Sequence, residues 1–221
     1  MNDMRQESSA PAASGMGFCL FRRLPRLAGE GLLLFLIAAA LLLAAEFGLR
    51  AVGFGHSTRL FIKKEFDGKH YWMTNGNFYQ QFFALPIDTM WHDAETYVPV
   101  FKPPNHCRIV ILGGSAALGD PPDFAFSFAR VLEVMLRERF PETHFDVYML
   151  AQPGVNSYVM YEAARACRRI QPDLFIVYMG NNEVNGPFGA TVQEANPWQM
   201  SLPLIRLRIR LRELRLAQLA A

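Results

Sequence analysis

Ser115 is the residue of this chain best placed to act as a nucleophile. It follows an apolar run over residues 109–112 and two glycines, Gly113 and Gly114. Four consecutive aliphatic residues are typical of a strand that is covered on both faces, and the glycines allow a sharp turn. Open α/β sheets bind ligands at the carboxyl ends of such strands. A serine hydroxyl there suits attack on an acyl carbonyl, although turns of this kind also serve as plain connections or bind phosphate.

Two familiar motifs do not describe this turn. It has no Gly-Lys-Ser/Thr ending, so it is not a Walker phosphate-binding loop. Ala117 stands where the motif Gly-x-Ser-x-Gly needs its second glycine. The role of Ser115 therefore depends on which functional groups from other parts of the chain lie near it.

The chain after Ser115 alternates between helix and strand patterns. Apolar spacing predicts helices over residues 124–140 and 156–170, with Asn156 or Ser157 capping the second. Buried strands are predicted over residues 145–150 and 174–179. Alternation of this kind predicts a parallel sheet with helices on both faces.

Three turns are expected to meet at one edge of this sheet, because parallel strands end at the same edge. These turns contain Ser115, Gly154 and Asn182. Acyl transfer needs a hydroxyl nucleophile and hydrogen-bond donors aimed at the oxyanion that forms on attack. We therefore predict an oxyanion hole made by the N–H of Ser115, the N–H of Gly154 and the side-chain amide of Asn182.

The three turns resemble the sequence blocks of the SGNH (GDSL-type) hydrolases. Residues 113–119 are similar to the first block, Gly-Asp-Ser-x-x-x-Gly, with Gly114 in place of Asp. Gly154 matches the second-block glycine, and residues 180–183 match Gly-x-Asn-Asp with Glu183 in place of Asp. The resemblance covers about residues 105–190 and points to the membrane-anchored bacterial branch. It implies a three-layer α/β/α flavodoxin-like sheet, incomplete at its carboxyl end, and hydrolysis of an ester without a metal or cofactor.

The base of the resembled family is not found in this chain. In that family an Asp-x-x-His block lies well downstream of the third block, whereas no histidine follows His144 here. His106 and His144 precede predicted strands and so belong at the opposite edge of the sheet. Three further histidines lie in an aromatic-rich segment, where surface or packing roles are commoner than a base folded over the site: His56, His70 and His92. We therefore expect a truncated hydrolase without its catalytic Asp and His, with little activity in these 221 residues.

The amino-terminal part predicts a membrane anchor. Residues 1–26 are expected to be a disordered cytoplasmic tail, and residues 27–50 a transmembrane helix. The unbroken apolar run over residues 31–45 spans about 22 Å, and carrying it to Leu49 nearly matches a hydrocarbon core of about 30 Å. A cleaved signal peptide is the alternative, but Leu43 stands where small residues are preferred. Arginines before the run predict that the amino terminus lies in the cytoplasm and the chain after residue 54 outside, and the resemblance implies that the membrane is the inner membrane of a bacterial cell.

The remaining segments carry weaker signals. Residues 55–104 are dense in aromatics and predict an extended segment with short strands that lies over the main domain, residues 105–221. Residues 185–189 read as a loop beside the site that could shape its pocket. Residues 202–219 alternate aliphatic residues with arginines, which suits a basic amphipathic helix or a strand. As a helix it is expected to place one leucine stripe against a membrane surface or a missing part of the domain: Leu204, Leu207, Leu211 and Leu214.

Composition narrows the possible functions. Apolar residues make up 51% of the chain, enough for a core, and a net charge of +2 gives no indication of a nucleic-acid partner. A disulfide between Cys107 and Cys167 would suit an oxidising compartment, but buried free thiols fit their predicted elements better. The leading hypothesis is a membrane-anchored serine esterase acting on acyl esters of envelope polysaccharide or lipid. The alternative is an inactive binding or assembly protein that holds an acyl or glycan ligand in the same crevice.

Overall fold

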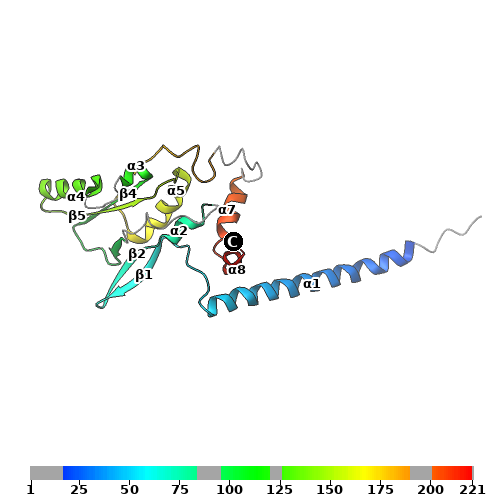
Figure 1. The fold of residues 1–221 in the computed structure, drawn as a ribbon. Coiled ribbons are helices and arrows are strands. Elements are labelled where there is room, and N and C mark those ends of the chain that lie inside the picture. The colour runs from blue at the N-terminus through cyan, green and yellow to red at the C-terminus, as the bar shows by residue number, and fades with distance from the viewer. Residues whose placement is uncertain (1–16, 84–95, 120–125, 190–200, 221) are drawn as a thin grey trace, which may run out of the picture. The chain divides into compact units, whose positions relative to one another are not determined.

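The computed structural model describes residues 17–83, 96–119, 126–189 and 201–220 (Figure 1). The chain forms two compact units, residues 1–54 and residues 55–221. The first unit contains one long helix. The second combines two small sheets with several helices.

The helix of the first unit, α1, spans Gly17–Ala51. Its part over Gly29–Ala51 has 23 residues, which is about 35 Å of helix, and is long and apolar enough to cross a membrane. Near its end Glu46 accepts a hydrogen bond of 2.7 Å from Arg50 Nε. Residues 17–26, which we expected within a disordered tail, are helical, because an established helix adds one hydrogen bond for each further residue. The rest of that tail lies outside the described residues.

The aromatic-rich segment forms an antiparallel sheet with the order β1-β2-β3. β1 (Phe61–Phe66) and β2 (Lys69–Thr74) are joined by the two-residue turn Asp67–Gly68, in which both residues have positive φ. β3 (Tyr97–Pro99) pairs with β2, and the short helix α2 (Asn77–Gln80) follows β2. The prediction of short strands is confirmed. Part of the aromatic side chains pack in the core of the unit, among them Phe61, Phe78 and Phe82.

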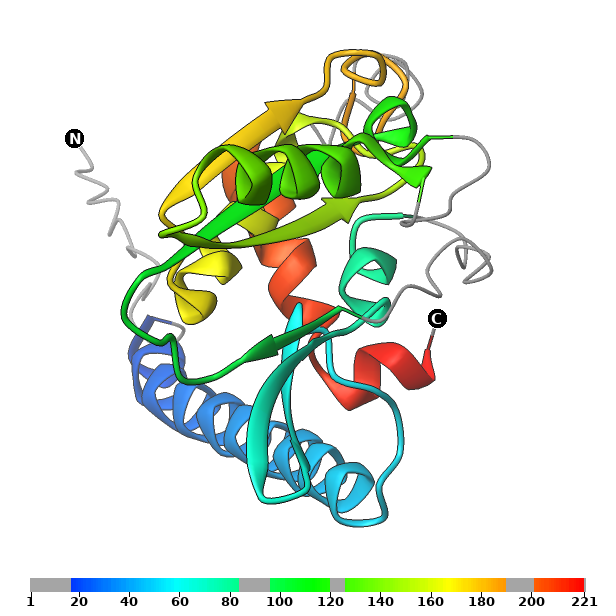
Figure 2. The same cartoon turned by 90° about the vertical axis from the view of Figure 1, so that its left-hand side faces the viewer.

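The second sheet is parallel and has the order β5-β4-β6. Its strands are β4 (His106–Gly113), β5 (His144–Ala151) and β6 (Leu174–Tyr178). β4 is central, and His106 pairs with His144 while Ile109 pairs with Leu174. In Figure 2 the three arrowheads point the same way, so the carboxyl ends of the strands share one edge. The predicted mixed α/β class with a parallel sheet is confirmed.

Helices cover both faces of this sheet. On one face α4 (Phe128–Arg139) packs on a cluster that contains Ile109 and Ile111. On the other face α5 (Ser157–Ala166) packs with Val110 and Leu112, because alternate residues of a strand point to opposite faces. α5 continues into a 3₁₀ turn, η3 (Cys167–Ile170).

Side-chain caps set where these two helices begin. Ser127 Oγ accepts a hydrogen bond from Arg130 N, so α4 starts at Phe128 and not at residue 124 as we expected. Residues 120–125 lie outside the described residues. Asn156 Oδ1 accepts from Val159 N, which confirms the predicted cap of α5.

β6 forms the predicted strand, but its expected burial is wrong. Leu174 is 51% exposed on one face of the sheet and Val177 is 60% exposed on the other. Among the described strands β6 pairs with β4 alone and so forms an edge of the sheet, and no described helix covers it as α4 and α5 cover β4. An apolar run thus favours burial of the strand, but the elements that pack beside the strand determine how much of it is buried.

The carboxyl-terminal segment is helical, which decides between the two predicted forms. It comprises α7 (Leu202–Leu211) and α8 (Arg215–Leu219). The leucine stripe at residues 204, 207, 211 and 214 is exposed, so its expected contact with a membrane surface or with a further part of the domain stays a prediction, whereas Ile205 is buried and Ile209 packs against the core of the unit. This helix therefore packs on the unit that the chain itself forms. Arg212 also donates a 3.0 Å hydrogen bond to the carbonyl oxygen of Gln80.

One buried arginine joins the aromatic-rich segment to the parallel sheet. The side chain of Arg108, on β4, is fully buried. Its guanidinium donates to the carbonyl oxygens of Pro99 at 2.8 Å, Phe101 at 3.1 Å and Ile170 at 2.8 Å. One side chain thus satisfies three carbonyls from two distant parts of the sequence.

The two cysteines whose side chains the structure describes are free thiols. Cys167 is buried and Cys107 is partly buried, and no disulfide joins them. Burial raises the pKa of Cys167 to about 12, so this thiol stays protonated and unreactive at neutral pH. The expectation of free thiols is confirmed.

Candidate active site

Gly113 ends β4 at a point where the backbone has no room for a side chain. A methyl group at this position would lie 2.2 Å from Ala117 Cβ and 2.6 Å from the carbonyl oxygen of Tyr178. The glycine thus lets the end of β4 approach both the end of β6 and the short helix α3 (Ser115–Leu118). Gly114 caps α3 in an extended conformation, and Ser115 follows as its first residue.

Ser115 lies on the surface of the unit. Its backbone carbonyl accepts a hydrogen bond from Gly119 N at 3.0 Å. Its hydroxyl has no hydrogen-bond partner among the described residues, and its side chain is exposed. The hydroxyl is therefore accessible to a substrate, but no described residue is in place to take its proton.

The predicted donor Asn182 lies beside the turn that carries Ser115. A methyl group on Gly114 would be 3.2 Å from Asn182 Nδ2. The same nitrogen donates a 3.0 Å hydrogen bond to the carbonyl oxygen of Val155. An amide nitrogen carries two hydrogens, so one N–H remains after this bond. The structure thus brings Asn182 and the Gly114–Ser115 turn together.

The predicted donor Gly154 lies in the turn after β5. Gly154 has φ 73°, a conformation that favours glycine, and a methyl group there would be 3.7 Å from Phe83 Cε1. Next to it, Gln152 N donates to the carbonyl oxygen of Gly113 at 3.1 Å. The N–H of Gly154 makes no hydrogen bond to a described residue. This turn is therefore hydrogen-bonded to the end of β4, and the N–H of Gly154 is available to a ligand.

Two side chains hold the second and third turns together. Glu183 accepts from Ser157 N at 2.9 Å and from Ser157 Oγ at 2.6 Å. Asn156 Nδ2 donates to the carbonyl oxygen of Pro187 at 2.8 Å. The sequence predicted Asn156 only as a helix cap and did not indicate these contacts, because they join positions about 26 to 31 residues apart whose proximity depends on the fold.

The loop over residues 185–189 is partly packed into the core. Phe188 is buried and has φ 61°, and its ring lies 5.4 Å from that of Tyr158 at a steep angle. Gly186 N donates to the carbonyl oxygen of Asn182 at 2.6 Å. The loop therefore supports the turn that carries Asn182, while the expected role in shaping a pocket stays a prediction.

None of the described histidines is near the nucleophile. His106 and His144 begin β4 and β5, and the length of β4 separates His106 from Gly113 by about 23 Å. His56 bonds with Gln218 of α8, and His70 lies 3.6 Å from Glu65 on the hairpin of β1 and β2. His92 lies outside the described residues.

No protein-family model, no curated protein and no solved structure matches this chain. The geometry of the three turns is therefore the basis for any statement about function. That geometry comprises an exposed hydroxyl on Ser115, a backbone donor at Gly154 and an amide donor on Asn182.

Proposed function

We propose that this protein is a serine ester hydrolase of the SGNH (GDSL) type in which Ser115 attacks the acyl carbonyl. The observation that supports this proposal is the meeting of three turns at one edge of the parallel sheet, where the amide of Asn182 lies beside the Gly114–Ser115 backbone. The N–H groups of Ser115 and Gly154 and the Asn182 amide would stabilise the oxyanion that the attack creates.

Two further features support the same assignment. The strand order β5-β4-β6 places the first strand between the second and the third, as in flavodoxin-like sheets. The turns that meet are those whose sequences resemble the three SGNH blocks, including the variants Gly114 and Glu183. Glu183 is engaged by Ser157 and supports the third turn.

The proposal requires a base from outside the described residues. Removal of the proton from the hydroxyl makes a serine nucleophilic, and no described side chain forms a hydrogen bond with Ser115 Oγ. The apolar part of α1 and the arginines before residue 27 support anchoring in the inner membrane, with the second unit on the periplasmic side. Acyl esters of envelope polysaccharide or lipid are the substrates that such a location offers.

Replacing Asn182 by alanine tests the oxyanion hole. In the protein made from its complete reading frame, the variant should lower kcat for a short acyl ester by about 10²-fold while KM changes little. The reason is that a donor aimed at the oxyanion acts mainly in the transition state. Steady-state kinetics measure both constants, and thermal unfolding reports the loss of the bond to Val155.

The matched control is Asn181→Ala, which removes the exposed asparagine next to Asn182. This variant should keep kcat within about twofold of the unchanged protein. Equal losses in the two variants, or none in either, would contradict the assignment of Asn182 to the oxyanion hole.

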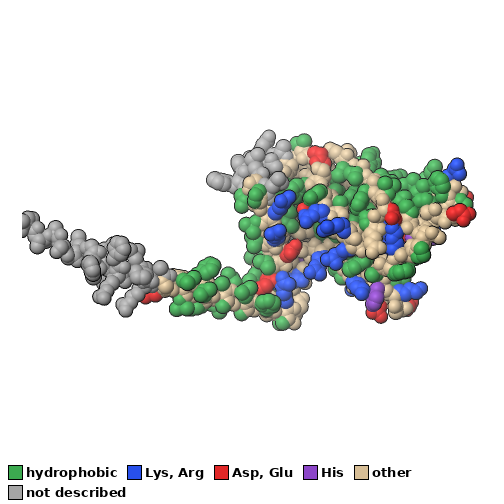
Figure 3. Space-filling view, turned by 180° about the vertical axis from the view of Figure 1, so that it is seen from behind, with side chains coloured by type: hydrophobic (Ala, Val, Ile, Leu, Met, Phe, Trp, Pro, Cys, Tyr) green, Lys and Arg blue, Asp and Glu red, His purple; other side chains and the backbone are tan. Residues whose placement is uncertain are grey.

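A second candidate function, non-catalytic binding of an anionic ligand, is favoured by a cleft in another part of the same unit. The cleft has a volume of about 630 Å³ and lies between the start of β1, the end of α5 and α7. Two glutamates and six arginines line it: Arg59, Arg165, Arg168, Arg169, Arg206 and Arg210. Arg165 pairs with Glu162 at 3.0 Å, whereas Arg59 and Arg210 pair with no described carboxylate. Basic side chains also gather in the middle of the face in Figure 3.

Exchange of two arginines tests this second function. The double change Arg206→Gln with Arg210→Gln should weaken binding of a soluble polyuronate to the full chain by at least about tenfold, because it removes two of the charges that attract the anion. Isothermal titration calorimetry at low and high salt measures the affinity, which should fall with salt. The control Arg139→Gln, on α4, should bind like the unchanged chain. No measurable binding by the unchanged chain would eliminate this candidate.

A further inference from the structure

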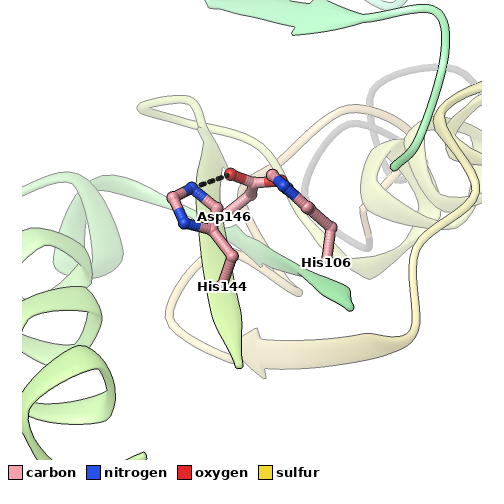
Figure 4. Close-up of side chains that lie close together, drawn as sticks. All are labelled: His106, His144 and Asp146. Carbon is pink, nitrogen blue, oxygen red and sulfur yellow. Dashed lines mark hydrogen bonds and ion pairs between the residues drawn. The ribbon is translucent and has the colours of Figure 1, made fainter. Parts of the chain in front are cut away.

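Two histidines and an aspartate form a cluster at the amino edge of the parallel sheet. His106 Nδ1 lies 2.9 Å from Asp146 Oδ2, and His144 Nε2 lies 3.4 Å from Asp146 Oδ1. Figure 4 shows the carboxylate of Asp146 beside the two imidazole rings. This cluster begins the strands whose opposite ends form the candidate active site, so it is a separate feature of the molecule.

The backbone of two paired strands holds these side chains together. His106 and His144 are direct partners in the parallel register of β4 and β5. Asp146 is two residues beyond His144 and therefore points to the same face of the sheet. The ring centroids of the two histidines are 4.3 Å apart. The proximity of the three groups thus follows from strand pairing and does not depend on a loop.

The carboxylate of Asp146 is largely buried without a permanent cation. Its side chain is 16% exposed, and among the described residues no Lys or Arg forms an ion pair with it. Arg108 is opposite Asp146 in the register, but its guanidinium donates to the carbonyl oxygens of Pro99, Phe101 and Ile170. A buried carboxylate is costly unless it is paired or bound to a metal.

We propose that His106, His144 and Asp146 bind a divalent transition-metal ion, with zinc as the ion that the donors fit best. Their candidate ligand atoms all lie within 4.8 Å of one another. Zn²⁺ bonds of about 2.0–2.2 Å in a tetrahedron set neighbouring ligand atoms about 3.3–3.6 Å apart. One carboxylate oxygen of Asp146 lies 3.4 Å from His144 Nε2 and the other lies 2.9 Å from His106 Nδ1, so side-chain rotation has only a short way to bring one atom of each residue to that spacing. Imidazole nitrogen favours zinc, cobalt, nickel or copper over magnesium and calcium.

The exposure of the two histidines determines which ligands complete the coordination of the ion. His144 is 52% exposed and His106 is 24% exposed, so water reaches the open side and completes the coordination. The rotation of the exposed His144 ring closes the remaining distance between the two imidazoles. The bound ion would link the amino ends of β4 and β5 and stabilise the sheet by binding the folded state.

The experiment measures zinc binding to the full chain in neutral detergent after treatment with a chelator. Isothermal titration calorimetry should show one Zn²⁺ per chain, and Zn²⁺ at 100 times its Kd should raise Tm by about 5–10 °C, whereas Mg²⁺ should not. Replacing zinc by Co²⁺ should give the visible absorption of a four-coordinate site. His144→Gln and Asp146→Asn should each weaken Zn²⁺ binding by at least about tenfold.

Two control variants separate this site from other ligands. His70→Gln removes the other histidine that lies beside a carboxylate on a strand and should bind Zn²⁺ like the unchanged chain. Cys107→Ser removes the thiol next to His106 and should also leave the affinity unchanged. The absence of Zn²⁺ binding would overturn the proposal. Binding that survives His144→Gln but is lost in Cys107→Ser would assign the ion to the thiol and overturn it as well.

Discussion

Ser115→Ala is expected to reduce hydrolysis of a short acyl ester by at least about 10³-fold in the protein made from its complete reading frame. The hydroxyl is the attacking group of the proposed reaction, and water cannot replace it in forming an acyl-enzyme. The measurement is the initial rate of ester cleavage at saturating substrate. Because the side chain is exposed and its hydroxyl bonds to no described residue, the free energy of unfolding should change by no more than about 0.5 kcal/mol.

Ser57→Ala serves as the matched control for this experiment. Ser57 Oγ accepts a 3.3 Å hydrogen bond from Arg59 N, and Ser57 is far from the three turns in the sequence. The control should keep its full rate. Unchanged turnover in Ser115→Ala would eliminate Ser115 as the nucleophile. Turnover by the 221-residue chain that is lost in His92→Ala would place the base in the segment 84–95.

Arg108→Leu is expected to destabilise the second unit by about 3–5 kcal/mol, which is a large part of the stability of an ordinary domain. The change removes a fully buried guanidinium that donates to three carbonyl oxygens, the buried one of Ile170 and the partly buried ones of Pro99 and Phe101. Each buried acceptor left without a donor costs about 1–3 kcal/mol. Urea unfolding of the full chain in detergent, followed by near-ultraviolet circular dichroism, measures the loss.

Arg165→Leu provides the comparison, because its side chain is 54% exposed and forms an exposed ion pair with Glu162. That variant should lose less than about 1 kcal/mol. Arg108→Lys should fall between the two, since an ammonium group cannot reproduce the planar fork of a guanidinium. If Arg108→Leu and Arg165→Leu unfold at the same urea concentration, the contacts of Arg108 do not stabilise the unit.

Local signals were sufficient for much of the parallel sheet. The apolar runs at residues 109–112 and 174–178 and the cap at Asn156 predicted elements that the structure contains. The hairpin at Asp67–Gly68 also had a local signal, an Asp-Gly pair typical of a two-residue turn between strands, although we expected only short strands there. These features depend on residues close together in the sequence, which is why a pattern reveals them.

Features that depend on the neighbours of an element could not be predicted. The sequence of α7 predicts the leucine stripe, which is exposed, but it did not indicate that Ile205 is buried and that Ile209 packs on the core, because contacts with the core and with Gln80 decide the rotation of the helix. The contact between Asn182 and Val155, and that between Arg108 and Pro99, join residues whose distance in space is set by the fold. At the site, the sequence identified the turns that meet, while the side chains that hold the turns together became visible only in three dimensions.

The exposed edge strand β6 has a consequence for handling the protein. It presents five uncharged residues in a row, Leu-Phe-Ile-Val-Tyr, and most of their side chains are exposed on both faces of the sheet. Short segments with high β-propensity, no charge and no proline are the kind that assemble into intermolecular sheets. Natural sheets usually protect an edge with charged residues or proline, and β6 has neither. When the second unit is produced at high concentration, self-association along β6 is the route by which it would aggregate.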